Sequence, residues 1–272
     1  MMTADLFEGR DIVTAMSILV MSWPFGIAMG QIGHVWLADA FGWWVPFQVA
    51  SAYCLVVAIA VFVLYRPPHD LPAPVKGTPL RLSGQEWRLL LCAAFAWAVF
   101  NAAYVIYLSF GPKVLEGLGQ TTLAAAAIIS LGSWVMIGSW ALCGFIADRF
   151  DRRRLILAAC MVGAIAALDL LRVPGAGVPA SLLFGLVGMA PAGVIMAMAG
   201  QAVRPAVRAF AMGVFFTVYY AIMLITPPLA GALFDATASA QGPIWLAMAL
   251  FACVVPLALA FHVYKAGPAV AA

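Results

Sequence analysis

Four side chains in the apolar run 89–110 are spaced so that they share one face of a helix: Trp97, Asn101, Tyr104 and Leu108. An amide and a phenol one turn apart could hold the hydroxyl or carbonyl groups of a small solute, with Trp97 as an apolar wall. Such side chains also hydrogen-bond neighbouring helices inside membranes, and their spacing leaves both roles open. Further aromatic candidates for contact with a solute are Trp134, Tyr219 and Tyr220.

Titratable side chains lie near the ends of two other apolar runs. His34 and Gln31 occupy the outer third of run 11–37, where an imidazole could relay protons near neutral pH or only satisfy a hydrogen bond. Asp169 and Arg172 are three residues apart beside another run, which predicts an ion pair at the membrane boundary. The middle of each run lacks Lys and Arg, and this disfavours a dedicated anion carrier.

The composition indicates whether these side chains are surrounded by water or by lipid. Of 272 residues, 65% are apolar and 9% are charged, and the mean hydropathy is +1.04. A soluble domain is about half apolar and about a quarter charged, so the composition predicts an integral membrane protein. A net charge of +3 is too small for nucleic-acid binding. The five cysteines lack metal-ligand spacing, and we expect no cofactor and no metal.

Eight apolar runs are long enough to cross a bilayer as helices, since about 20 residues span its core. The chain is therefore expected to be all-α, a polytopic membrane helical bundle. The runs are 11–37, 43–65, 89–110, 121–147, 155–171, 178–203, 209–234 and 243–264.

The basic residues predict which way the runs cross. With the N-terminus inside, twelve of the fourteen Lys and Arg residues fall on the inner side and only Lys113 and Arg172 on the outer side. Both termini are therefore expected in the cytoplasm, with the chain in a cell (inner) membrane. The longest connection, 66–88, contains five prolines and is predicted to be an extended cytoplasmic linker between two runs and the following six.

A motif between the fourth and fifth runs carries a family resemblance. The segment from Gly144 to Arg154 reads GFIADRFDRRR. It resembles the G-x-x-x-D-R-x-G-R-R/K signature of the major facilitator superfamily, in the copy between that family's eighth and ninth helices. Asp151 stands where the family usually has glycine.

The resemblance implies a partial form of a twelve-helix fold. Residues 1–65 would form the last two helices of an incomplete N-terminal bundle, 66–88 the linker, and 89–272 the C-terminal six-helix bundle. A misplaced gene start, a fragment and a natural short form are all consistent with this reading. In the family the helix matching 89–110 lines the cavity, and the motif acts as a cytoplasmic gating loop. The residues that carry the gating role over are Gly144, Asp148, Arg149, Arg152 and Arg153.

The expected function is secondary transport of a small solute by alternating access, driven by a coupling ion or by the solute's own gradient. The expected partners are the solute and the lipid bilayer, with no nucleic acid. The alternative is a truncated or non-transporting membrane protein that acts as a fragment or partner of another helical bundle. An enzyme is not expected, because the usual catalytic motifs, such as His-Glu-x-x-His, do not occur.

Overall fold

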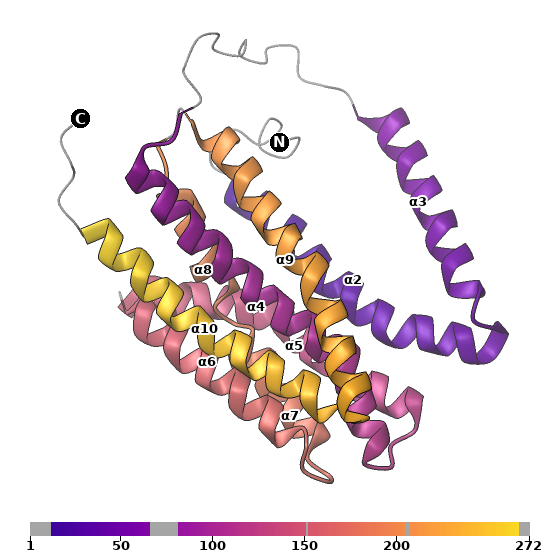
Figure 1. Cartoon of the computed structure of the whole chain (residues 1–272). Coiled ribbons are helices and arrows are strands. Elements are labelled where there is room, and N and C mark those ends of the chain that lie inside the picture. Colours follow the sequence, from indigo (N-terminus) through magenta and orange to yellow (C-terminus); the bar gives the residue numbers. More distant parts are fainter. Residues whose placement is uncertain (1–11, 66–80, 151, 205–206, 267–272) are drawn as a thin grey trace. The chain divides into compact units, whose positions relative to one another are not determined.

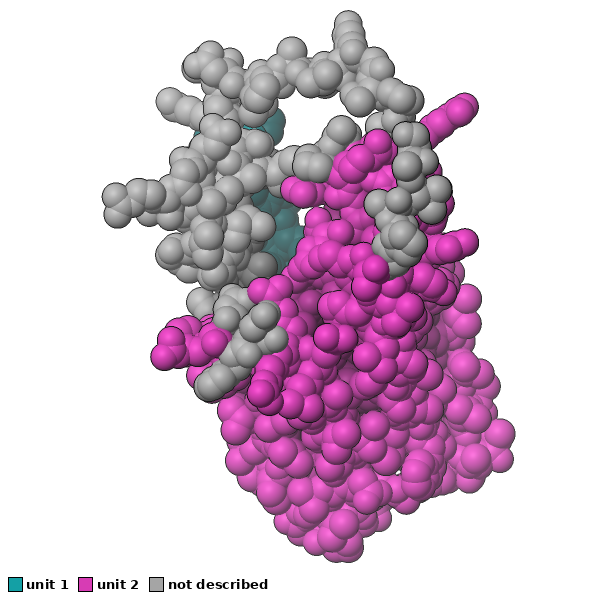
Figure 2. Space-filling model, turned by 90° about the vertical axis from the view of Figure 1, so that its left-hand side faces the viewer, with its two compact units in different colours: residues 1–77 teal, residues 78–272 magenta. Residues whose placement is uncertain are grey.

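The computed structural model describes residues 12–65, 81–150, 152–204 and 207–266, apart from the side chains of 12–22, Asp148 and Phe150. Every regular element in these ranges is a helix, so the predicted all-α fold is confirmed (Figure 1). The chain divides into two compact units, unit 1 over residues 1–77 and unit 2 over residues 78–272 (Figure 2). Residues 66–80 of the predicted linker lie outside the described residues, and its last residues begin a helix.

The described residues of unit 1 form two helices, α2 (Ile12–Phe41) and α3 (Val45–Leu64). Proline at the first turn of α3, where its missing N–H costs nothing, marks the start of that helix. Among the residues of α3, all of them described, only Pro46 is buried, although the helix is apolar on every face. A helix of this kind requires lipid or further apolar helices around it.

Unit 2 is built around α4 (Gly84–Gly117), which packs against α9 (Arg208–Thr237) and along α10 (Gln241–Ala266). Figure 1 shows α4 and α10 running side by side, with α6 (Arg153–Leu170) next to α10. Alanines recur among the buried residues of α4 and allow this close approach, as small residues do in membrane bundles. They are Ala93, Ala94, Ala96, Ala98, Ala102 and Ala103.

The helix α5 (Thr122–Phe150) packs against a segment that the sequence predicted as one continuous run, 178–203. That run is instead α7 (Gly177–Leu183), a π-helical turn (Phe184–Gly188) and α8 (Ala192–Gln201). Pro191 precedes α8 and has no N–H to continue the ladder. The turn lies against neighbouring backbone, because a Cβ on Gly188 would come 2.9 Å from the Ala164 Cα. Broken helices of this kind occur in transporters, where the breaks tend to mark functional sites.

The helical segments match the eight predicted runs in position. Six of them, judged on the described residues, are long and apolar enough to cross a membrane: Val45–Leu64, Gly84–Gly117, Thr122–Ala147, Gly177–Gln201, Arg208–Thr237 and Gln241–Ala266. The short α6 carries Arg153 and Arg154 at its start and Asp169 near its end. Charges at both ends of an apolar helix are typical of the points where a span leaves the hydrocarbon.

The charges of unit 2 separate towards its two ends. At one end the start of α4 meets the ends of α8 and α10, since Gln85 donates to the Tyr264 carbonyl (3.3 Å) and Lys265 to Gln201 (2.6 Å). We call this the basic end of unit 2; it carries Arg88, Arg152, Arg153, Arg154, Arg204 and Lys265. At the opposite end Arg172 pairs with Asp169 at 2.9 Å, so that predicted ion pair is confirmed.

Candidate functional site

Aromatic side chains from α4 and α9 meet on the surface of unit 2. The ring centroids of Trp97 and Tyr219 are 6.5 Å apart, and those of Tyr219 and Tyr220 are 4.7 Å apart. Phe216 stacks on Tyr220 at 6.3 Å. Trp97 and Tyr219 are half-buried, whereas Tyr220 is 63% exposed. We call these four residues the aromatic face; three of them, all but Phe216, are among the candidates predicted from the sequence.

The aromatic face could bind a solute through ring surfaces and phenol hydroxyls. Aromatic side chains offer large contact areas to apolar or ring-shaped groups, and the hydroxyls of Tyr219 and Tyr220 add hydrogen-bonding capacity. Trp97 also contacts Phe100 at 6.2 Å, and Phe100 packs edge-on against Phe251 of α10 at 5.9 Å. The face is thus anchored to the core of unit 2.

Two of the other residues predicted on the Trp97 face of α4, Asn101 and Tyr104, point into the bundle, and the third, Leu108, is half-buried. Asn101 is 3% exposed, and its amide donates to the Trp97 carbonyl at 2.8 Å. The hydroxyl of Tyr104 is buried and shares a hydrogen bond of 2.9 Å with the hydroxyl of Ser133 on α5. For Tyr104, the alternative role of hydrogen bonding to a neighbouring helix is therefore observed, with Ser133 of α5 as the partner. A role of either residue towards a solute stays a prediction.

A buried hydroxyl network next to Tyr104 was not predicted from the sequence. The hydroxyl of Tyr107 donates to the Ser181 hydroxyl (3.1 Å) and lies 3.3 Å from the Ile129 carbonyl, while its ring stacks on Phe184 at 3.9 Å. Ser139 of α5 donates to the Gly185 carbonyl at 2.7 Å. These bonds tie α4 and α5 to α7 and the π-helical turn. The sequence signal that could have indicated a break in the helix there is the presence of Gly185, Gly188 and Pro191 in and just after that turn.

Two further candidates lie elsewhere. Trp134 follows the inward-facing Ser133 on α5 and is 38% exposed. His34 is exposed on α2 in unit 1, and its role as a proton relay stays a prediction. Within the described residues, no group of three or more His, Cys, Asp or Glu side chains is placed to hold a metal ion.

The motif between the fourth and fifth runs lies almost entirely on two helices and not in an extended loop. The helix α5 continues through Phe150 and α6 begins at Arg153, so Gly144 and Arg149 lie on α5 itself. Arg149, Arg152 and Arg153 are exposed. The side chain of Asp148 and the whole of Asp151 lie outside the described residues. The structure therefore presents the motif's arginines at a helix–helix corner, which is compatible with the predicted gating role without testing it.

An ion pair between Glu86 and Arg204 at the basic end was also not predicted from the sequence. Glu86 forms a capping box with Ser83 at the start of α4, where its carboxylate accepts the Ser83 backbone N–H at 2.8 Å. The same carboxylate accepts from the Arg204 backbone N–H (3.0 Å) and from its Nε (2.9 Å). Glu86 is buried, and it joins the first turn of α4 to the residues that follow α8. The Ser-x-x-Glu spacing at 83–86 was the signal in the sequence.

Comparison with known proteins places this architecture in a family. The family model of the Major Facilitator Superfamily matches residues 1–199. Among solved structures, the chain resembles a bacterial homologue of the human lysosomal transporter Spinster, in an inward-facing and unoccupied conformation, with a TM-score of 0.61 and 17% identity. The match covers 97% of this chain and 73% of that one, and at this identity it shows the fold alone. Comparison with curated proteins gives no match. Because the family model matches well over half of its residues, the chain belongs to the major facilitator superfamily.

Proposed function

We propose that this chain is a secondary transporter that moves a small solute by alternating access, with the aromatic face as part of the solute path. Membership of the major facilitator superfamily supports transport in general. The observation that carries the finer proposal is the contact between Trp97 of α4 and Tyr219 of α9, which leaves a ring surface and two phenols at the edge of unit 2. Aromatic residues that only filled the core would be buried, as Phe100 and Phe251 are.

The proposed solute has an apolar or ring-shaped part, and a hydrogen-bonding group on it would add contacts to the phenols of Tyr219 and Tyr220. The four residues of the aromatic face are all uncharged, so an inorganic anion would find no counter-charge among them. Ring faces do attract organic cations, which places such cations within the range of solutes to be tested.

The proposed orientation places the basic end of unit 2 in the cytoplasm and the chain in a cell (inner) membrane. The distribution of Lys and Arg along the sequence supports this orientation, because positively charged segments are retained on the inner side. The segregation of charge in the folded unit supports it further, since Arg88, Arg204 and Lys265 gather at one end. Both termini are then cytoplasmic.

The proposed gate is the helix–helix corner that contains Gly144, Asp148, Arg149, Arg152 and Arg153. The exposure of Arg149 and Arg152 supports the proposal, because exposed guanidinium groups can reach carboxylates on another bundle when the transporter closes on that side. His34 is the proposed proton relay if transport is coupled to protons. A proton gradient across the membrane should then change the rate of solute uptake, and His34→Gln should remove that change.

Uptake into liposomes tests the proposal. The full chain is reconstituted and uptake of three radiolabelled probes is measured: glucose, phenylalanine and tetraphenylphosphonium. We expect uptake of at least one probe above that of empty liposomes, and Trp97→Ala to lower it about 2- to 10-fold, as the loss of an aromatic contact implies. The matched control is Phe95→Ala, because Phe95 is also exposed on α4 but lies on another side of the helix.

Two results would count against this reading. If Phe95→Ala and Trp97→Ala lowered uptake equally, the aromatic face would have no special part in the solute path. If the full chain moved none of the three probes, the alternative of a non-transporting membrane protein, acting as a fragment or partner of another bundle, would be favoured.

A further inference from the structure

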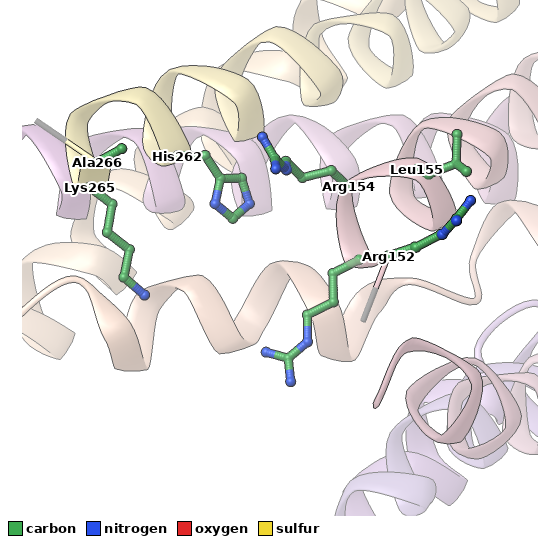
Figure 3. Close-up of a pocket in the computed structure, with 7 residues that line it drawn as sticks. Arg152, Arg154, Leu155, His262, Lys265 and Ala266 are labelled. Carbon is green, nitrogen blue, oxygen red and sulfur yellow. The ribbon is translucent and has the colours of Figure 1, made fainter. Parts of the chain in front are cut away.

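A basic pocket of about 620 Å³ opens at the basic end of unit 2, between the start of α6 and the end of α10. Three consecutive arginines, Arg152–Arg154, line it from the side of α6, and His262 and Lys265 line it from α10. In Figure 3 the side chains of Arg152, His262 and Lys265 border one open space, and Arg154 extends towards His262. Leu155 and Ala266 complete the lining, so the described lining residues contain no Asp or Glu.

The local electrostatics favour an anion in this pocket. The N-terminus of a helix carries a partial positive charge, and an acidic residue or a capping side chain usually offsets it. The first turn of α6 has no acidic residue, and Arg152 at its N-cap position makes no side-chain capping bond. Arginine in the first turn adds to the partial charge rather than offsetting it. Lys265 contacts the neutral side-chain oxygen of Gln201, which satisfies its hydrogen bonding but not its charge.

The surroundings of the pocket distinguish a lipid from a free ion. Leu155 begins a stripe of exposed residues on α6 that continues through Ala159 to Val162. Ala266 ends a corresponding stripe on α10, formed with Leu259 and Val263. Both stripes run from the charged pocket along the apolar part of each helix. A ligand with a phosphate at one end and acyl chains at the other would satisfy both the pocket and the stripes.

We propose that this pocket binds the phosphate headgroup of an anionic phospholipid, whose acyl chains lie along the exposed stripes of α6 and α10. Basic pockets between membrane helices suit anionic headgroups, and each Lys or Arg near the membrane surface strengthens such binding about fivefold. The site is distinct from the aromatic face, which contains residues of α4 and α9. It therefore does not depend on which solute the chain moves.

Native mass spectrometry of the delipidated full chain in detergent tests the proposal. Phosphatidylglycerol and phosphatidylcholine with identical acyl chains are titrated separately, and inorganic phosphate is added as a competitor in a third arm. We expect phosphatidylglycerol to bind at least about tenfold more tightly than phosphatidylcholine. We expect Arg154→Gln/Lys265→Gln to weaken phosphatidylglycerol binding about 30-fold, since two charges are removed.

Two control variants keep the result interpretable. Lys113→Gln/Arg208→Gln removes the same net charge outside the pocket and should leave the affinity for phosphatidylglycerol within about threefold of the wild type. Arg154→Lys/Lys265→Arg keeps both charges in the pocket and should retain the binding. This variant therefore separates loss of charge from loss of fold. The midpoint of thermal unfolding without lipid, measured for every variant, makes the same distinction independently.

Three outcomes would overturn the proposal. The first is equal affinity for phosphatidylglycerol and phosphatidylcholine. The second is an equal loss of binding in Arg154→Gln/Lys265→Gln and in Lys113→Gln/Arg208→Gln. The third is complete displacement of phosphatidylglycerol by millimolar inorganic phosphate, which would assign the pocket to the free ion instead of a lipid.

Discussion

The contact between the π-helical turn and α5 leaves no room for a side chain, and Gly185→Ala tests this directly. A Cβ on Gly185 would overlap the carbonyl oxygen of Gly132 and lie 2.8 Å from its carbonyl carbon. Both partners are backbone atoms, so neither can rotate away as a flexible side chain would. The substitution must separate the two segments, and this in turn stretches the 2.7 Å hydrogen bond from Ser139 to the Gly185 carbonyl.

The expected cost follows from these two contacts. Overpacking a tight interface costs about 1–3 kcal/mol, and a rigid backbone clash belongs at the upper end of that range. Loss of the Ser139 bond adds about 1 kcal/mol. A total of about 4 kcal/mol corresponds to a fall of about 8–16 °C in the midpoint of thermal unfolding, at about 2–4 °C per kcal/mol.

A thiol-reactive dye measures this midpoint in detergent, because Cys143 and Cys160 are buried and react only when unit 2 opens. The matched control is Gly193→Ala on α8, where an added Cβ meets nothing within 4 Å. That variant should shift the midpoint by no more than about 4 °C, because Gly→Ala in a helix changes stability by at most about 1 kcal/mol. If Gly185→Ala unfolded at the same temperature as Gly193→Ala, the proposed backbone contact between the π-helical turn and α5 would be wrong.

Three further variants test other contacts. Tyr107→Phe removes the donor to Ser181 and should cost about 1–2 kcal/mol, seen as a midpoint lowered by about 2–8 °C; an unchanged midpoint would show that this bond contributes no stability. Glu86→Gln removes the charge that pairs with the largely exposed Arg204, so we expect a loss of about 1–2 kcal/mol that shrinks in high salt; a loss independent of salt would contradict an ionic role. Asp148→Asn in the proposed gate should raise the labelling of a cysteine placed in the cytoplasmic vestibule, and unchanged labelling would argue against a latch.

The positions of the membrane helices could be predicted closely from the sequence, because hydropathy reports the bilayer core directly. The run 43–65 corresponds to α3 (Val45–Leu64), and the run 121–147 to α5 (Thr122–Phe150). Helix ends outside the hydrocarbon follow other rules. The run 89–110 misses the first turn of α4, because that turn is held by the polar capping box of Ser83 and Glu86 and not by apolar residues.

The break in the run 178–203 could not be predicted from hydropathy, since its residues are apolar whether they form an α-helix or a π-helical turn. Pro191 indicated only that the hydrogen-bond ladder loses a donor nearby. The place where the backbone is displaced depends on Gly185 meeting Gly132, and that contact joins two helices far apart in the sequence. Tertiary packing therefore decides a feature that no local pattern contains.

The candidate site shows the same division between local and long-range information. The ion pair between Asp169 and Arg172 was predicted correctly because both partners lie within one helical turn. The spacing of Trp97 and Tyr104 placed them on one face of a helix, but α4 is apolar on all sides, so the pattern could not say what each residue meets. Ser133 of α5 draws Tyr104 into the core, whereas Tyr219 of α9 meets Trp97 at the surface. A face shared along one helix is thus divided by its neighbours into a part that is bonded inside the bundle and a part that is exposed at its surface, and a role of either part towards a solute stays a prediction.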